Sequence, residues 1–181
     1  YSFRDLPVEL ISNIYQLFVK DASSSIYTPP ALVRLMLEEV LSWERLDKLM
    51  AGDGVILDPA CGSGVFLVEA YRRLVLHWRW RHDWERPGID DLRPLLQRVH
   101  GIDLEEGAVE LAAFSLCLSL CDALQPEEIR SSVKLFPPLA DVTLHHSCFF
   151  DAKTKGLVKV PVAVIVGNPP FESSLTTEGA K

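Results

Sequence analysis

The residues best suited to chemistry in this chain are Asn168, Pro169, Pro170 and Phe171, which directly follow the apolar run 161–166. The run predicts a buried parallel strand, and the two prolines would end it and fix the backbone that follows. The Asn168 amide oxygen and the Pro169 carbonyl then offer two hydrogen-bond acceptors at one spot, beside the flat ring of Phe171. This combination suits a planar group that bears an amino nitrogen.

A second candidate site follows the apolar segment 55–57, where Asp58 is succeeded by a turn of small residues. In open α/β sheets, ligands bind where the carboxyl end of a strand meets such a turn, and glycines allow close approach. The glycine spacing matches neither a dinucleotide fingerprint nor a phosphate loop, so a nucleotide phosphate is not expected. Taken alone, the segment could be an ordinary strand-to-helix turn. The turn consists of Pro59, Ala60, Cys61, Gly62, Ser63 and Gly64.

A third acidic position, Asp103, ends the apolar segment 99–103, and Leu104 follows it before a helical pattern begins. A carboxylate in this place can accept hydrogen bonds from both hydroxyls of a ribose, as it does in dinucleotide-binding folds. Asp is also a favourable residue at the start of a helix. The two roles are compatible, and neither is excluded by the sequence.

In order and spacing, these segments resemble the adenine-N6 DNA methyltransferases of restriction-modification systems, in the group whose motifs run in the gamma order. Residues 58–64 match the first motif of that family. Asp103 matches its ribose-binding acid, and residues 168–171 match its catalytic Asn-Pro-Pro-Tyr/Phe. The resemblance covers nearly the whole chain, and the four motifs together are highly specific.

The fourth match lies ahead of the first motif, in Tyr27, Thr28 and Pro29. In the family such a segment forms part of the cofactor pocket at its methionine end. By itself it could simply begin a helix, with Thr28 as the cap and proline in the first turn. Because it stands in the right order and spacing with the other three motifs, we expect it to belong to the pocket.

The resemblance implies methyl transfer from S-adenosylmethionine to the N6 amine of an adenine in double-stranded DNA, which leaves S-adenosylhomocysteine. The target base would be flipped out of the duplex and stacked on Phe171. Specificity or restriction subunits would be further partners, and no metal is expected. The catalytic residues would be those at 168–171. The cofactor would be bound by Tyr27, Thr28, Pro29, Asp58, Pro59, Ala60, Cys61, Gly62, Ser63, Gly64, Asp103, Leu104, Ser147 and Asn168.

One position departs from the family pattern. Members usually have an Asp that contacts the adenine amine of the cofactor, and the matching stretch 144–151 has Ser147 there. A hydroxyl accepts a hydrogen bond more weakly than a carboxylate does. Asp151 would take the role if the register were shifted.

Other functions remain compatible with these residues. An Asn-Pro-Pro-aromatic segment is also typical of methyltransferases that act on a protein glutamine or an RNA base, whereas cytosine-N4 enzymes usually have Ser in place of Asn. A non-catalytic cofactor-binding subunit is a second class, suggested by Ser147. A dinucleotide oxidoreductase is disfavoured by the glycine pattern.

Strands that alternate with helices predict an α/β fold with a parallel sheet flanked by helices. We expect helices over 64–80, near 90–98 and over 105–121, a strand over 99–103 and an irregular stretch over 124–141.

The resemblance specifies a Rossmann-like S-adenosylmethionine-dependent methyltransferase fold, truncated after its fourth strand. We expect residues 1–50 to form an N-terminal helical segment with the pocket motif, including one long helix over 31–50. Residues 51–181 would form part of the catalytic domain, without its last strands or a target-recognition domain. This portion alone would not methylate DNA.

Composition agrees with a compact cytoplasmic domain. The 181 residues are 48% hydrophobic, and no apolar run approaches the ~18 residues of a membrane span. The net charge of −7 argues against this segment being the main DNA-gripping surface. The stretch 72–98 is a local exception, with seven arginines, four acids and three tryptophans. It could contact nucleic acid, but we expect packing on a neighbouring domain.

The cysteines and histidines show no metal-binding spacing. Cys61, Cys117, Cys121 and Cys148 are expected to be reduced, buried thiols. His145 and His146 are adjacent on an expected strand, where successive side chains point to opposite faces. One ion could not easily bind both.

Overall fold

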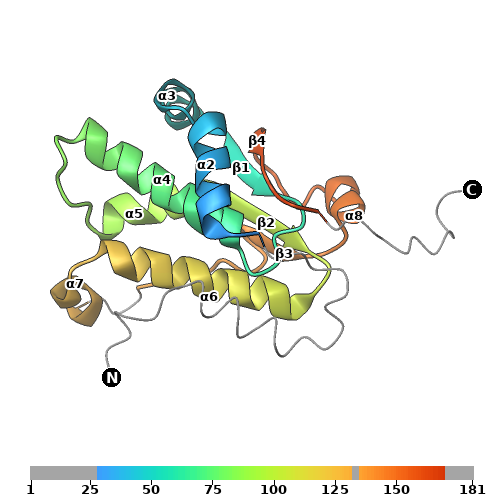
Figure 1. The fold of residues 1–181 in the computed structure, drawn as a ribbon. Helices are drawn as coiled ribbons and strands as arrows, with labels where there is room; N and C mark the ends of the chain where they lie inside the picture. The colour runs from blue at the N-terminus through green and yellow to red at the C-terminus, as the bar shows by residue number, and fades with distance from the viewer. Residues whose placement is uncertain (1–27, 132–134, 170–181) are drawn as a thin grey trace, which may run out of the picture.

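The computed structural model describes residues 28–131 and 135–169. Its centre is a parallel sheet with helices on both faces (Figure 1). The strands in the described ranges are β1 (Val55–Asp58), β2 (Val99–Asp103), β3 (Leu144–His146) and β4 (Val162–Ile165). They lie in the order β3-β2-β1-β4, with every neighbouring pair parallel. The predicted α/β class and parallel sheet are therefore confirmed.

The strand order reverses between β1 and β4. The chain adds β2 and β3 on one side of β1 and then crosses to the other side to form β4. Such a reversal opens a crevice at the carboxyl ends of the strands, and that crevice is the usual ligand site of open α/β sheets. The residues that follow β1 and β4 are therefore brought to one place by the topology.

Three helices cover one face of the sheet. They are α2 (Pro30–Val40), α4 (Val65–Arg81) and α6 (Glu106–Ala123), and α4 lies between the other two. The opposite face is covered by the short helix α8 (Phe149–Thr154), whose Ala152 packs against Leu57 and Ile102.

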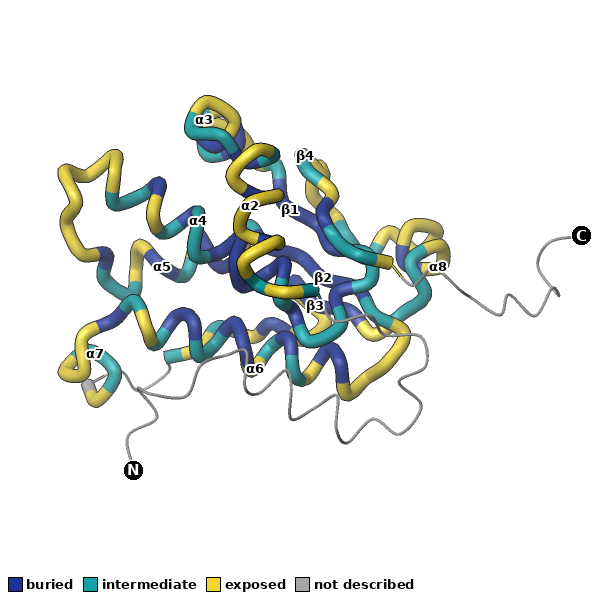
Figure 2. Tube along the Cα trace, viewed as in Figure 1, coloured by how far each residue is buried: buried dark blue, intermediate teal, exposed yellow. Residues whose placement is uncertain are grey.

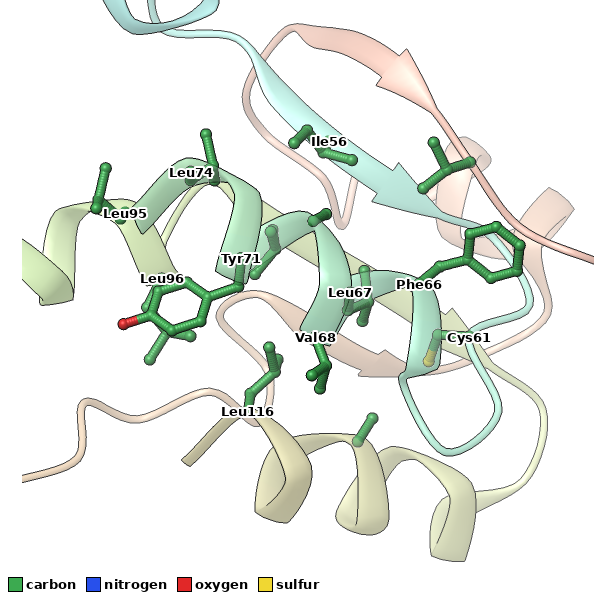
Figure 3. Close-up of a cluster of buried hydrophobic side chains, with 14 of the residues drawn as sticks. Ile56, Cys61, Phe66, Leu67, Val68, Tyr71, Leu74, Leu95, Leu96 and Leu116 are labelled. Atoms are coloured by element: carbon green, nitrogen blue, oxygen red, sulfur yellow. The ribbon is translucent and has the colours of Figure 1, made fainter. Parts of the chain in front are cut away.

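The main core lies between the sheet and the helix layer. In Figure 3, Leu67 and Tyr71 of α4 lie between Ile56 of the sheet and Leu116 of α6, and Leu74 of α4 belongs to the same buried cluster. All five side chains are fully buried. Burying such side chains stabilises a fold by about 1.5–3 kcal/mol each, so this layer holds α4, and the turn from which α4 starts, in place.

The single helix predicted over 31–50 is wrong. The structure has two helices, α2 and α3 (Trp43–Ala51), separated by Leu41 and Ser42. Ser42 has an extended backbone, and its Oγ accepts a hydrogen bond from the Arg45 N–H at 3.4 Å, so it caps α3. Buried residues lie on both sides of the break, which explains why the hydrophobic pattern alone did not reveal it.

The other helices and strands lie close to their expected places. The helix expected over 64–80 is α4, that expected over 105–121 is α6, and a short helix near 90–98 is α5 (Ile89–Leu96). The stretch 124–141, expected to be irregular, contains the additional helix α7 (Pro126–Ser131). None of the helices in the described ranges is long and apolar enough to cross a lipid bilayer.

The expectation that the strand within 161–166 is buried is also wrong. Val162 and Ile165 of β4 are 40% and 60% exposed. In Figure 2, β4 is drawn in the colours of partial and full exposure, whereas β1 is buried. Among the described residues, β4 pairs only with β1, so it forms an edge of the sheet.

Candidate active site

Asp58 and the turn behind it occupy the carboxyl end of β1. The Asp58 side chain is 1% exposed, and its Oδ1 accepts a hydrogen bond from the Ala60 N–H at 3.1 Å. Burial, together with the nearby Asp103 carboxylate, raises the pKa of Asp58 to about 7, although the Ala60 hydrogen bond opposes the shift. This side chain is therefore a buried acceptor that organises the turn from within.

Two glycines of the turn have left-handed backbones. Gly62 has a φ of +51° and Gly64 one of +84°, a region that other residues adopt at a cost. A Cβ atom on Gly64 would lie 3.0 Å from the Cα and Cβ of Ala112, so Gly64 also lets α4 approach α6 closely. A Cβ atom on Gly62 would meet nothing within 4 Å. The turn therefore packs inward at Gly64 and faces open space at Gly62.

Asp103 joins this turn to the end of β2. Its Oδ2 accepts a hydrogen bond from the Gly62 N–H at 2.7 Å, and its Oδ1 accepts one from the Glu105 N–H at 3.0 Å. The carboxylate thus supports both the turn and the start of α6. Each carboxylate oxygen has a further lone pair, so Asp103 can still accept hydrogen bonds from a ligand. Leu104, beside it, is 66% exposed.

Gly167 brings the start of the Asn-Pro-Pro-Phe segment close to Asp58. Its φ is +152°, and a Cβ atom on it would lie only 2.5 Å from Asp58 Oδ1. Glycine is therefore required by both the backbone and the close contact. Gly167 was not among the predicted site residues. Its position directly before the Asn-Pro-Pro-Phe segment was the available signal.

Asn168 meets the segment that precedes α2. Its Nδ2 donates a hydrogen bond to the Thr28 hydroxyl at 3.0 Å, across 140 residues of sequence. Thr28 does not cap α2, because the residue at the cap is Pro29 and no side chain caps the helix there. The two segments expected to belong to one pocket are thus in direct contact. Tyr27, Pro170 and Phe171 lie outside the described residues.

An apolar cleft of about 270 Å³ adjoins Gly167 and Pro169, between α2 and the end of β4. Pro59 and Pro169 place both motifs on its wall. The contribution of α2 to the cleft, by Met36, Leu37 and Val40, was not predicted from the sequence, although these apolar residues recur at helical spacing. The remaining lining residues are Phe66, Ile165 and Val166.

The carboxyl ends of the strands thus bring together Asp58, Asp103, the glycine turn and the Asn168 amide. A family described as N-6 DNA Methylase matches residues 9–181. The chain belongs to the N-6 DNA Methylase family.

The chain is similar to a subunit of a restriction enzyme and to an adenine-specific methyltransferase. The chain is 31% identical over 114 residues to the methylase subunit of the type I restriction enzyme MjaVII from Methanocaldococcus jannaschii, which covers 58% of the chain and 18% of that subunit. It is 41% identical over 68 residues to the adenine-specific methyltransferase PglX from Streptomyces coelicolor, covering 35% of the chain and 5% of the relative. The chain therefore spans less than a fifth of either protein.

The fold is also that of solved restriction-modification enzymes. The ATP-dependent Type ISP restriction-modification enzyme LlaBIII, solved bound to DNA, superposes with a TM-score of 0.56 at 20% identity. The match covers 91% of this chain and 12% of that enzyme. At this identity the similarity establishes the fold alone, and it confirms the methyltransferase fold that the motifs predict.

Ser147 lies where the family pattern has an acid. Its N–H donates to the Asp103 carbonyl at 2.8 Å, so it follows β3 beside the end of β2. Its hydroxyl donates to the Cys148 carbonyl at 3.1 Å. Asp151, the alternative residue for this role, lies exposed on α8, 3.9 Å from the Lys155 ammonium. The role of Ser147 towards a cofactor stays a prediction.

The two adjacent histidines point to opposite faces, as expected. His145 is buried, whereas His146 is exposed and its Nε2 lies 2.9 Å from the Leu104 carbonyl. Within the part of the chain that the structure describes, no three His, Cys, Asp or Glu side chains gather as a metal site. Cys61 is buried, and this burial raises the pKa of its thiol. Cys117, Cys121 and Cys148 are free thiols that are only partly buried.

The stretch rich in arginine and tryptophan lies away from these residues. It includes the last turns of α4, a helix whose first turn adjoins the glycine turn. Seventeen helical residues span about 25 Å, so the stretch does not take part in the same site. Trp80 stacks on Trp43 at 5.7 Å between ring centroids, and Trp84 is 55% exposed. Packing on a neighbouring domain stays a prediction.

Proposed function

We propose that this chain forms the cofactor-binding and catalytic core of an enzyme that methylates the N6 amine of adenine in DNA, within a restriction-modification system. The hydrogen bond between Asn168 and Thr28 supports this most strongly, because it joins the catalytic segment to the first pocket segment. Asp58 and Asp103 lie at the ends of the two adjacent strands. The described residues of the four motifs therefore lie together at the carboxyl ends of the strands.

The residues present fit S-adenosylmethionine. Asp103 retains lone pairs for the ribose hydroxyls, and the open space at Gly62 lets a ligand reach the turn. Leu104 offers an exposed apolar surface for the adenine ring, and Thr28 would face the methionine end. Ser147 would take the position of the usual acid and leave the adenine amine less tightly held. When bound, the cofactor supplies an electrophilic methyl group.

The chain's own residues would then prepare the target amine. That amine is a poor nucleophile because its lone pair is delocalised into the ring. The Asn168 oxygen and the Pro169 carbonyl would accept its two N–H groups, favour a tetrahedral nitrogen and stabilise the developing positive charge. Phe171 would stack on the flipped base. Holding both partners in line accounts for much of the expected rate, and no side chain with a tuned pKa is needed.

DNA and partner subunits complete the proposal. LlaBIII was solved bound to DNA, and the MjaVII relative is the methylase subunit of a restriction enzyme. This chain has a net charge of −7, so other parts of the full-length protein or its partners would supply the basic DNA-gripping surface. A cytoplasmic location is part of the same proposal, since the DNA substrate lies there.

Transfer of a labelled methyl group to duplex DNA by the full-length protein tests this proposal. The unmodified protein should label adenine, and Asn168→Ala should abolish labelling while binding S-adenosylhomocysteine within a few-fold of the unmodified protein. Asp90→Asn is a control, because the Asp90 side chain is 95% exposed on α5, and it should leave the rate unchanged. Full activity in Asn168→Ala would refute the assignment of the catalytic residue. A folded protein that binds cofactor without methylating would be a non-catalytic subunit.

A further inference from the structure

The Asn168 amide must face in one direction to be useful. An amide presents an acceptor oxygen at one end and an NH₂ donor at the other, with nearly the same shape. An amine that is to be held by its N–H groups needs the oxygen. Within the described residues, the side chain of Asn168 donates a hydrogen bond from Nδ2 to Thr28, so its Oδ1 can accept one from a ligand.

A hydroxyl alone does not fix that orientation. The Thr28 oxygen can accept from Nδ2, or its proton can be donated to Oδ1 when the amide is turned over. The turned amide would direct N–H groups at the target amine, and the two sets of donors would repel each other. The orientation becomes fixed only when the Thr28 proton is donated to another acceptor, because only lone pairs then face Asn168.

Thr28 directly precedes a helix that is fixed to its neighbour. This helix, α2, is joined to α4 by an ion pair between Arg34 and Glu69 at 2.9 Å, and Glu69 is 5% exposed. At the other end of α2, the Arg73 guanidinium donates to the Leu41 carbonyl at 2.6 Å. The helix next to Thr28 is therefore not expected to move when the Asn168 amide turns.

We propose that Thr28 is a positioning residue that orients the Asn168 amide, and that it does so when its proton is donated to the carboxylate of the bound methyl donor. This inference rests on the proposed function. It goes beyond cofactor binding, because the contact of Thr28 with the cofactor prepares Asn168 for the target amine. Cofactor binding is thereby coupled to the readiness of the catalytic amide.

Two substitutions in the full-length protein separate this role from simple cofactor binding. Thr28→Val keeps the shape and removes the hydroxyl, whereas Thr28→Ser keeps the hydroxyl. With saturating cofactor and DNA, kcat should fall on the order of tenfold or more in Thr28→Val, the factor that one lost hydrogen bond of ordinary strength gives. Thr28→Ser should stay within about threefold of the unmodified protein.

A role confined to cofactor affinity would give a different result. Thr28→Val would then weaken the binding of S-adenosylhomocysteine, measured by calorimetry, and leave kcat at saturation unchanged. That outcome would overturn the inference while leaving the proposed function intact. If the unmodified full-length protein did not methylate DNA at all, the proposed function itself would be wrong.

The Asn168→Asp background provides a second readout. A carboxylate has two equivalent oxygens, so it has no wrong orientation for Thr28 to prevent. Within that background, adding Thr28→Val should change kcat by less than about twofold, although the same substitution is costly beside Asn168. An equal cost in both backgrounds would show that Thr28 acts through general packing, and would overturn the inference.

Discussion

Gly167→Ala is expected to disrupt the site through a single added methyl group. The new Cβ would lie 2.5 Å from Asp58 Oδ1 and 3.1 Å from its Cγ, inside contact distance. Asp58 cannot move away freely, because it is 1% exposed and its Oδ1 is held by the Ala60 N–H. Overpacking of this kind costs about 1–3 kcal/mol. The φ of +152° adds a backbone strain of about 1–3 kcal/mol for a residue with a side chain.

The total of about 2–6 kcal/mol is a large part of the 5–15 kcal/mol that stabilises a typical domain. Relief of the contact would move the next residue, Asn168, by a distance that matters for an aligned reaction. Hydrogen exchange of the β1 and β4 peptides in the full-length protein measures the stability, and labelled methyl transfer measures the activity. We expect faster exchange in both strands and at least a hundredfold loss of rate.

Gly52→Ala is a matched control for this prediction. Its Cβ would meet only the Lys48 carbonyl, at 3.8 Å, and its φ of −113° is ordinary. The exchange rates and activity should therefore stay within the small range of surface substitutions, about 0.5 kcal/mol. If Gly167→Ala behaved like Gly52→Ala, the close contact between Asp58 and Gly167 would be refuted.

Three further substitutions test the turn and its acids. Burial raises the pKa of Asp58 from 3.8 to about 7, so the folded protein binds the Asp58 proton more tightly than the unfolded protein does. The protonated Asp58 therefore contributes its full share of stability below about pH 4, and this share is lost as the pH rises to about 7. Asp58→Asn should remove this pH-dependent loss. At pH 8 it should raise the free energy of unfolding by up to about 4 kcal/mol relative to the unmodified protein. Urea titrations at several pH values measure this, and an unchanged pH profile would contradict the prediction. Gly64→Ala places a Cβ 3.0 Å from Ala112 at a φ of +84°, and should cost about 2–4 kcal/mol in the same titrations and weaken cofactor binding; full stability would be the contrary result. Asp103→Asn weakens the hydrogen bond from the Gly62 N–H and leaves a poorer acceptor for the hydroxyls of a ribose. Calorimetry should therefore show at least tenfold weaker binding of S-adenosylhomocysteine. Equal affinity would mean that Asp103 is not part of the cofactor site.

The sequence predicted the parts of the fold that depend on local patterns. The strand 99–103 is found at those residues, and α4 and α6 lie within two residues of their expected bounds. Their apolar periodicity and the glycine turn between β1 and α4 are strong local signals. The break at Ser42 was missed because a cap of one residue does not interrupt a continuous apolar face.

Features set by distant residues could not be predicted in the same way. An apolar run such as 161–166 indicates a strand, but it does not say whether a neighbour covers the outer edge, and β4 proved exposed. The bond between Asn168 and Thr28 joins residues 140 apart, and the contact of Gly167 with Asp58 depends on the crossing of β4 beside β1. The motifs named the residues of the site, whereas only the topology shows which of them touch.

The most direct test of the central claim is the identity of the methylated base. Plasmid DNA from cells that express the full-length protein would be digested to nucleosides and analysed by mass spectrometry. We predict N6-methyladenine above the level in cells with the Asn168→Ala protein. Methylation of cytosine N4, or of a protein glutamine in the absence of any modified adenine, would contradict the account.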